Sequence, residues 1–153
     1  MAGSDFFRLV VRGRQTHGAK PWDGLDPIVV AAQIVTGLQT IVSRQLDIAS
    51  DPAVVTIGAI KGGVRHNIIP ETVEMLGTFR TFGPEIREDV LRRIRATAEH
   101  IAAASGATVE FELGPDPNPA VVNDPALTRR MLPVLERVAP GKVRAIGLLT
   151  SSE

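Results

Sequence analysis

In the stretch Phe7-Arg8-Leu9-Val10-Val11-Arg12, the apolar residues Phe7, Leu9 and Val11 alternate with Arg8 and Arg12. A period of two is typical of a strand with one buried face, so we predict a first strand here. Asp26-Pro27 then has the pattern of a helix N-cap followed by proline at the first helical position. The helix predicted over residues 27–44 carries apolar side chains on more than one face, which indicates a second surface to bury.

Four further elements follow from the same kind of periodicity. Two β-branched runs predict strands over residues 54–60 and 73–82, and three- and four-residue spacing of apolar side chains predicts a helix over 85–104. Gly106 fits a left-handed cap, and residues 109–113 alternate as a fourth strand. The order β-α-β-β-α-β across residues 5–113 predicts an α+β, ferredoxin-like domain: a four-stranded antiparallel sheet with two helices on one face.

Residues 114–153 do not belong to that unit. A proline-rich exit over residues 114–119 cannot continue the sheet. A helix is expected over 125–138, with a kink or an early end at Pro133, and an unpartnered strand over 143–149. We interpret this segment as a linker and the truncated start of a second domain.

Composition limits the classes of partner. The chain has 153 residues, enough for one domain, and its 17 basic and 17 acidic side chains cancel. No net field therefore favours nucleic acid or an anionic membrane, and we expect a small-molecule or protein partner. The longest apolar stretch, residues 28–35, is too short to cross a bilayer.

Cysteine usage and the N-terminus say little about location. There is no cysteine, which excludes disulfides and thiolate metal sites but leaves the redox compartment open. Residues 1–5 do not have the pattern of a signal peptide. We expect a cytoplasmic location, or a periplasmic or secreted one if an export signal lies upstream.

Three polar residues stand at the ends of predicted strands. His17 lies between two glycines just after the first strand, Asn67 lies in the loop before Pro70, and Arg80 lies late in the third strand. An imidazole, a carboxamide and a guanidinium can together hold a carboxylate and a developing oxyanion. Each also has a structural alternative: a turn histidine bonded to a nearby carbonyl, an asparagine capping its own loop, and an exposed strand arginine.

A metal site within the chain is not expected. His17, His66 and His100 have neither helical i, i+4 spacing nor a nearby carboxylate in a ligand pattern. His100 is expected to be a solvated residue near a helix C-terminus.

Taken together, these motifs resemble the lid, or dimerisation, domain of the zinc-dependent aminoacylases. That group includes hippurate hydrolases, auxin-conjugate amidohydrolases and related carboxypeptidases. The resemblance covers residues 5–113 almost continuously and extends weakly to residues 122–127. It rests on Gly13-x-x-x-His17-Gly18-Ala19-x-Pro21, Asp26-Pro27, Gly62-Gly63, Asn67-Ile68-Ile69-Pro70 and Gly77-Thr78-Phe79-Arg80-Thr81-Phe82.

The resemblance implies that this chain supplies only part of an active site. The lid interrupts a catalytic domain that holds two divalent metal ions (zinc, manganese or cobalt), whose ligands and general base are missing here. His17 would reach across a homodimer to stabilise the oxyanion formed from an N-acyl amino acid, and Asn67 and Arg80 would bind the substrate's carboxylate. The dimer would form through the first helix and the sheet edge. The chain alone binds no cofactor and should be inactive.

Two residues depart from the family pattern. His66 stands where an uncharged or apolar residue is more common, so the pocket is expected to titrate near neutral pH. Trp22 either lines the cleft or covers a loop, and we expect the loop.

Two other interpretations stay open. The chain would also suit a free-standing ferredoxin-like module that binds an amino acid or merely dimerises, since this architecture hosts unrelated functions. The other interpretation is that the chain is the product of a degraded gene and has no role.

Overall fold

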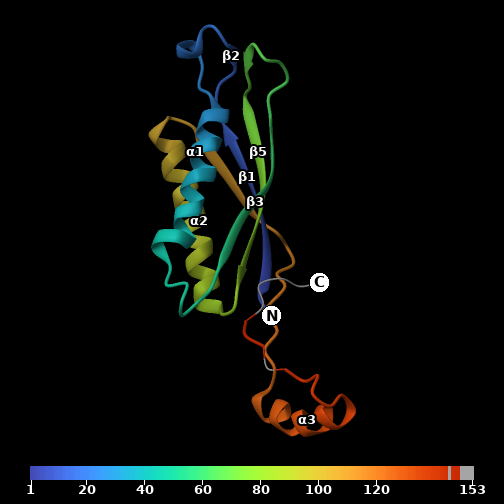
Figure 1. Ribbon diagram of the computed structural model, residues 1–153. Helices are drawn as coiled ribbons and strands as arrows, with labels where there is room; N and C mark the ends of the chain where they lie inside the picture. The colour runs from blue at the N-terminus through green and yellow to red at the C-terminus, as the bar shows by residue number, and fades with distance from the viewer. Residues whose placement is uncertain (145, 149–153) are drawn as a thin grey trace.

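The computed structural model describes residues 1–144 and 146–148. Its body is a four-stranded sheet with two helices, in the predicted order (Figure 1). Strand β1 starts earlier than predicted, because its first residues also pair with β5. The elements are β1 (Gly3–Arg12), α1 (Pro27–Thr40), β3 (Val54–Gly62), β5 (Thr72–Thr81), α2 (Pro84–Ala104) and β6 (Thr108–Leu113).

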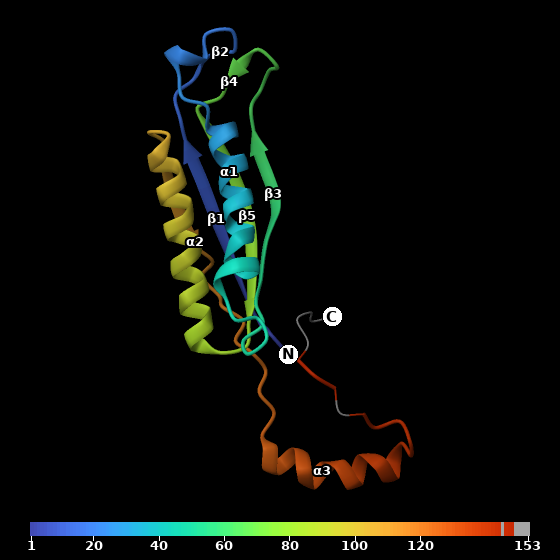
Figure 2. The same ribbon diagram turned by 60° about the vertical axis from the view of Figure 1, so that its left-hand side comes forward.

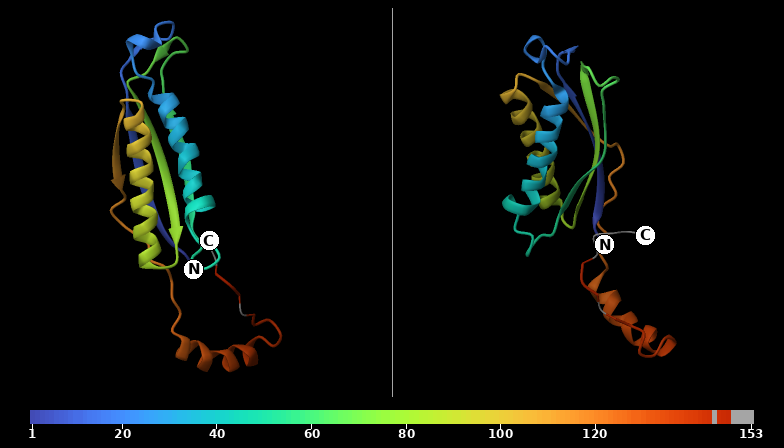
Figure 3. Two further views of the ribbon diagram at one scale, coloured as in Figure 1. Left: turned by 90° about the vertical axis from the view of Figure 1, so that its left-hand side faces the viewer. Right: turned by 45° about the horizontal axis from the view of Figure 1, so that its top comes forward.

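The sheet has the strand order β3-β5-β1-β6, and every neighbouring pair is antiparallel. Strands β1 and β5 form its centre, so β3 and β6 are the edges. Helices α1 and α2 lie side by side on one face, as Figure 2 and the left view of Figure 3 show. The predicted α+β class, antiparallel sheet and one-sided helix layer are confirmed.

Helix α1 begins where the sequence predicts. Asp26 Oδ1 accepts hydrogen bonds from the backbone N–H groups of Ile28 (2.8 Å) and Val29 (3.4 Å), and Pro27 is the first helical residue. The α-helix ends at Thr40 and a π-helical turn, Ile41–Gln45, continues it, so the predicted end at residue 44 falls inside that turn. Gly106, after α2, has a φ of 76°, the left-handed conformation expected of a cap.

The core lies between the sheet and the helices. Side chains of β1 and β5 that point toward the helices meet the inward faces of α1 and α2. The largest fully buried residues are Phe79, Leu9, Ile34, Leu38, Ile41, Met75, Ile94, Val11, Val73, Val90 and Pro27.

One helical run is long and apolar enough to span a membrane by length and composition. It covers Pro27–Gln45, with a mean hydropathy of 1.2. Its inward side chains, among them Ile34 and Leu38, are fully buried against the sheet, which is how a core helix of a folded domain behaves.

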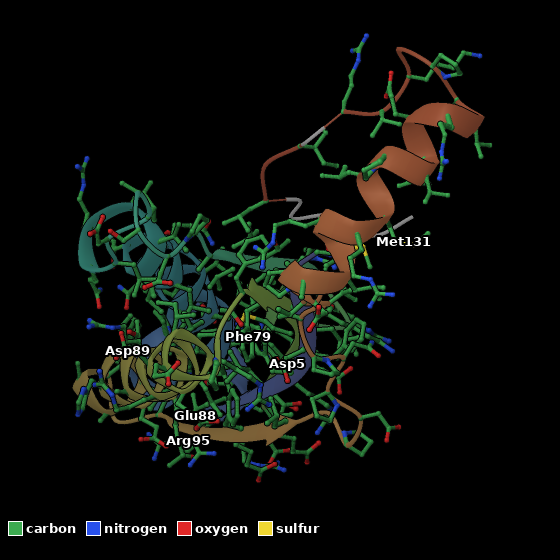
Figure 4. The ribbon with its side chains drawn as sticks, turned by 90° about the horizontal axis from the view of Figure 1, so that it is seen from below. Asp5, Phe79, Glu88, Asp89, Arg95 and Met131 are labelled. Carbon is green, nitrogen blue, oxygen red and sulfur yellow. The ribbon has the colours of Figure 1, made fainter. Side chains whose placement is uncertain are left out.

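An ion pair is buried at the start of β1. Asp5, only 4% exposed, accepts two hydrogen bonds from Arg87 of α2, at 3.0 Å from Nε and 2.7 Å from Nη2. The bond to Asp5 raises the pKa of the Arg87 guanidinium above its ordinary value. Figure 4 shows Asp5 and Phe79 inside the body, whereas Met131 lies on the separate C-terminal helix. The pair therefore ties the first strand to the second helix.

The chain after β6 returns along the start of β1. Ser4 and Asn118 exchange backbone hydrogen bonds of 2.8 and 3.1 Å, and the Val121 N–H donates to the Met1 carbonyl at 3.0 Å. Residues 1–4 and 118–121 thus form a short two-stranded ribbon at the lower end of the sheet in Figure 1.

Beyond this ribbon, helix α3 (Pro125–Val138) stands apart from the body, and all its residues are exposed (Figure 3). It continues through Pro133, so the expected early end is wrong: proline removes one backbone donor, and the helix keeps its other bonds. The predicted strand over 143–149 is also wrong for residues 143, 144 and 146–148, which lack a strand to pair with. Residues 145 and 149 lie outside the described residues.

Replacing Asp5 tests the buried pair. Asp5→Asn removes the charge that Arg87 faces, and breaking a pair that is largely buried should cost about 2–3 kcal/mol of unfolding free energy. Urea unfolding followed by circular dichroism measures it. The control is Glu110→Gln, whose pair with Arg12 is solvent-exposed and should contribute little. Equal losses in both variants would show that burial does not matter here.

Candidate functional site

Two short strands, absent from the sequence prediction, join His17 to Asn67. Strand β2 (Thr16–His17) pairs with β4 (Ile68–Ile69), and the Gly18 N–H donates to the Asn67 carbonyl at 2.8 Å. Figure 2 shows this ribbon at the end of the sheet opposite the chain's N-terminus. Residues fifty positions apart in the sequence are therefore held together by backbone bonds.

Close backbone contacts fix the loop that carries His17. Arg14 and Leu25 exchange two backbone hydrogen bonds of 2.9 Å, which close the loop into a tight ring. A Cβ atom on Gly13 would lie 2.3 Å from the Leu25 carbonyl oxygen, and one on Gly24 would lie 2.3 Å from Thr16 Cγ2. Only glycine fits at these two positions, so the sequence selects this loop shape.

His17 is exposed, and one of its ring nitrogens is already engaged. Nδ1 accepts a hydrogen bond from the Ala19 N–H at 3.0 Å. In a neutral imidazole this assigns the proton to Nε2, the nitrogen farther from the backbone. The ring therefore presents an N–H donor to the outside. The turn-histidine alternative is confirmed in part, because the ring is bonded to its own turn, although to the Ala19 N–H and not to a carbonyl.

Asn67 is exposed at the same end of the molecule. Its backbone carbonyl is used by Gly18, but within residues 1–144 and 146–148 its side-chain carboxamide has no hydrogen-bond partner. It does not cap its own loop, so both its donor and its acceptor are available to a ligand.

Arg80 lies at the other end of the sheet. It is paired in register with Ser4 of β1, whereas the β2–β4 ribbon follows the opposite end, where Arg12 is paired with Thr72. The eight residue steps from Thr72 to Arg80, at about 3.4 Å each, separate the two ends by roughly 27 Å. One chain thus brings His17 and Asn67 together and leaves Arg80 apart.

The environment of Arg80 is not that of an exposed strand residue. Its side chain projects from the helix-free face of the sheet, since the core residues Phe79 and Met75 occupy the opposite parity of β5. The residue is half-buried, and its Nη1 atom is buried without a hydrogen-bond partner among the described residues. An unpaired guanidinium in such a place is suited to an anionic ligand.

Ser4 is a neighbour that the sequence analysis did not single out. Its hydroxyl is also buried without a partner in the described part of the chain, and it lies opposite Arg80. Extending the β1 alternation backwards from Arg8 and Phe6 would have placed Ser4 on the helix-free face. Its pairing with Arg80 depends on strand register, which the sequence does not display.

His66, His100 and Trp22 all lie on the surface. His66 and His100 are both exposed, in agreement with the solvated reading of His100. Trp22 is 74% exposed on the 3-10 turn Pro21–Asp23, so the expectation that it covers a loop is wrong. The loop is closed by backbone bonds instead, between Arg14 and Leu25.

The described residues do not suit a metal ion. Within them, no three His, Cys, Asp or Glu side chains converge in a way that would hold one.

The sequence is similar to a known protein family and to several curated proteins. The pattern of the peptidase dimerisation domain family matches residues 2–106. An N-acetyl-L-cysteine deacetylase of Bacillus subtilis (strain 168) is 42% identical over 130 residues, 84% of this chain and 30% of that protein. An N-acyl-L-amino acid amidohydrolase of Geobacillus stearothermophilus is 39% identical over 111 residues, 72% of this chain and 30% of that protein.

A solved structure agrees. A Bacillus subtilis protein described as a dinuclear metal-binding peptidase of the M20 family superposes with a TM-score of 0.69 at 36% identity, covering 90% of this chain and 32% of that one. The chain thus spans about a third of the length of the curated relatives it matches.

The loop glycines offer a test of how His17 is positioned. Gly24→Ala places a methyl group 2.3 Å from Thr16 Cγ2 and 2.7 Å from the Arg14 carbonyl oxygen, so the ring-shaped loop must open. Hydrogen exchange of the Gly18 amide should accelerate at least tenfold, while the β1–β5 amides keep their protection. Gly58→Ala is the control, because its nearest neighbour would be 4.0 Å away. Unchanged exchange at Gly18 would contradict this account.

Proposed function

Because the chain belongs to the peptidase dimerisation domain family, we propose that it is the lid and dimerisation part of a metal-dependent amidohydrolase that cleaves N-acyl amino acids. The names of two relatives support this substrate class, and the fraction of their length that the chain spans is consistent with a part of a longer enzyme. In this proposal residues 5–113 are the lid, and residues 114–153 lead back into the catalytic domain.

The proposed dimer forms through α1 and the edge strand β3. Two apolar side chains near the start of α1, Ile28 and Val29, are 44% and 54% exposed, and the outward edge of β3 has no neighbouring strand. A second copy can cover both features at once, continuing the sheet from β3 to β3 and packing α1 against its twin.

A two-fold dimer would bring together what one chain keeps apart. The observation that carries the proposal is the distance, within one chain, of Arg80 from His17 and Asn67. In β3, Val54 lies opposite Arg80, and Gly62 lies toward the His17 end of the sheet. A two-fold axis that pairs two β3 strands antiparallel sets the Val54 end of one protomer beside the Gly62 end of the other. Arg80 of one protomer would thereby approach His17 and Asn67 of its partner.

A small substrate needs such an arrangement. In an N-acyl amino acid the scissile carbonyl carbon and the carboxylate carbon lie within about 4 Å. No such molecule reaches across the roughly 27 Å of one sheet. A site shared between protomers removes the difficulty.

The proposed roles follow from the donors that the chain presents. His17 Nε2–H would donate to the carbonyl oxygen as it gains negative charge, a contribution of about 10²–10³ in rate. The planar fork of Arg80 and the carboxamide of Asn67 would hold the carboxylate. Two divalent ions held by the rest of the parent would supply Lewis-acid activation of water.

A substitution on α1 tests the dimer. Val29→Glu puts a carboxylate into the proposed apolar contact, where its desolvation should dissociate the dimer at micromolar concentration. Light scattering after size-exclusion chromatography gives the mass. His100→Glu, exposed on α2, should leave the dimer intact. A dimer that survives Val29→Glu unchanged would exclude this face.

Mutant kinetics of the parent enzyme test the roles of the site residues. With an N-acyl amino acid, His17→Ala should lower kcat about 10²–10³-fold, while Arg80→Ala should mainly raise KM, because ground-state binding is lost. His100→Ala is the neutral control. Small and equal effects of both changes would contradict the assignments.

Mixing the two variants tests the shared site, at a substrate concentration far below the KM of Arg80→Ala, where each variant alone turns over little. In a heterodimer of His17→Ala and Arg80→Ala subunits, one site has lost both residues and the other keeps both. Equimolar exchange of subunits should therefore restore about a quarter of the wild-type rate. Sites made within one chain would restore nothing.

A further inference from the structure

Two buried side-chain atoms in the described part of the chain have no hydrogen-bond partner: Ser4 Oγ and Arg80 Nη1. Ser4 is only 7% exposed, so its hydroxyl cannot turn to bulk water. Leaving a buried polar group unsatisfied costs about 1–3 kcal/mol, more for a charged group, and folded proteins rarely tolerate it without a reason. Both atoms belong to residues at the same end of the sheet.

The sheet register sets the two side chains against each other. Ser4 and Arg80 are direct partners across β1 and β5, so they project from the same face. Ser4 turns its backbone N–H and carbonyl toward Asn118, which makes its pairing with Arg80 the non-hydrogen-bonded kind. Partners of that kind have Cα atoms about 4.5 Å apart and side chains that approach closely.

No acidic side chain of the described residues neutralises this position. On the same face, Arg8 takes Glu74 and Glu112, and Arg12 takes Glu110. Asp5 is occupied by Arg87 on the helix side of the sheet. Arg80 is absent from the ion pairs and hydrogen bonds of these residues, and it is only half-buried, which leaves a way in for a ligand.

We propose that the Ser4 hydroxyl and the Arg80 guanidinium form one anion subsite, in which Ser4 donates the second hydrogen bond to a ligand carboxylate. The Ser4 hydroxyl can donate a hydrogen bond and the guanidinium can only donate, so one ligand acceptor group would satisfy both side chains. The ligand class rests on the proposed function, in which Arg80 holds the carboxylate of an N-acyl amino acid. A carboxylate offers acceptors to both donors, whereas the NH₂ group of a neutral amide would face a donor.

Ser4 thereby becomes a specificity residue for charge. Hydrogen bonds to an ionised group are worth more than neutral ones, and a site built to make them discriminates strongly against a ligand that lacks the acceptor. The hydroxyl also ties the subsite to the ribbon of residues 1–4 and 118–121, since Ser4 is bonded through its backbone to Asn118.

The test is a titration of the 153-residue chain by two-dimensional NMR, with N-acetylglycine as the probe and N-acetylglycinamide as its neutral match. N-acetylglycine should give saturable shifts at the Ser4 amide and the Arg80 Nε–H, and N-acetylglycinamide should not. Ser4→Ala should weaken N-acetylglycine about tenfold. Thr72→Ala, which removes a hydroxyl from the same face at the far end of β5, should leave the affinity unchanged.

Thermal unfolding separates this role from a structural one. Ser4→Ala removes a buried hydroxyl that has no partner, so the unliganded variant should be at least as stable as the wild type. A hydroxyl that held the fold together would lower the melting temperature when removed. Ser4→Thr keeps the donor and should retain most of the affinity.

Two results would overturn the proposal. Equal affinity of Ser4→Ala and wild type for N-acetylglycine would mean that the ligand does not bond to the hydroxyl. Equal shifts with N-acetylglycinamide would mean that the subsite does not distinguish a carboxylate from a neutral amide. Both results leave the proposed hydrolysis of N-acyl amino acids standing, because an activity assay of the parent tests that separately. Conversely, carboxylate binding through Ser4 would stand even if the parent failed to hydrolyse N-acyl amino acids.

Discussion

Strand β1 is hydrogen-bonded on both sides, to β5 and to β6, and its length governs the geometry of the molecule. The loop that carries His17 follows one end of this strand, and Ser4 and the ribbon to Asn118 occupy the other. Because a paired central strand can neither shorten nor bend back, His17 and Arg80 are kept at a fixed separation. In the proposed function, that separation is the reason why a second copy of the chain is needed.

Two arginines on the helix-free face of the sheet, Arg8 and Arg12, have their charges balanced by neighbouring glutamates. Hydrogen bonds to Glu74 raise the pKa of the Arg8 guanidinium, and those to Glu110 raise that of Arg12, while Arg12 lowers the pKa of the Glu110 carboxyl. These shifts mark pairs that are already satisfied by one another. Arg80 has no such neighbour among the described residues, and its proposed role in binding depends on this contrast.

The sequence predicted those parts of the fold that bury one face of a regular element. Alternation in β1 and helical spacing in α2 are direct consequences of the core, so both elements were recognisable. The β2–β4 ribbon was not, because two-residue strands have no periodicity and depend on Gly13, Gly24 and the Arg14–Leu25 bonds. His17, Asn67 and Arg80 were identified as candidate site residues, but the position of Arg80 relative to the other two depends on strand register, which the sequence does not display. The exposure of Trp22 depends on the absence of tertiary packing against the indole among the described residues.

The ribbon formed by residues 1–4 and 118–121 has a consequence for how such a domain is built into a larger protein. The segments that enter and leave the domain run alongside each other and are hydrogen-bonded at Ser4 and Asn118. The two ends of the domain therefore lie next to each other. A host that carries it need not separate its own two halves to accommodate it. A domain with adjacent ends can be inserted into, or exchanged between, larger proteins without changing their cores.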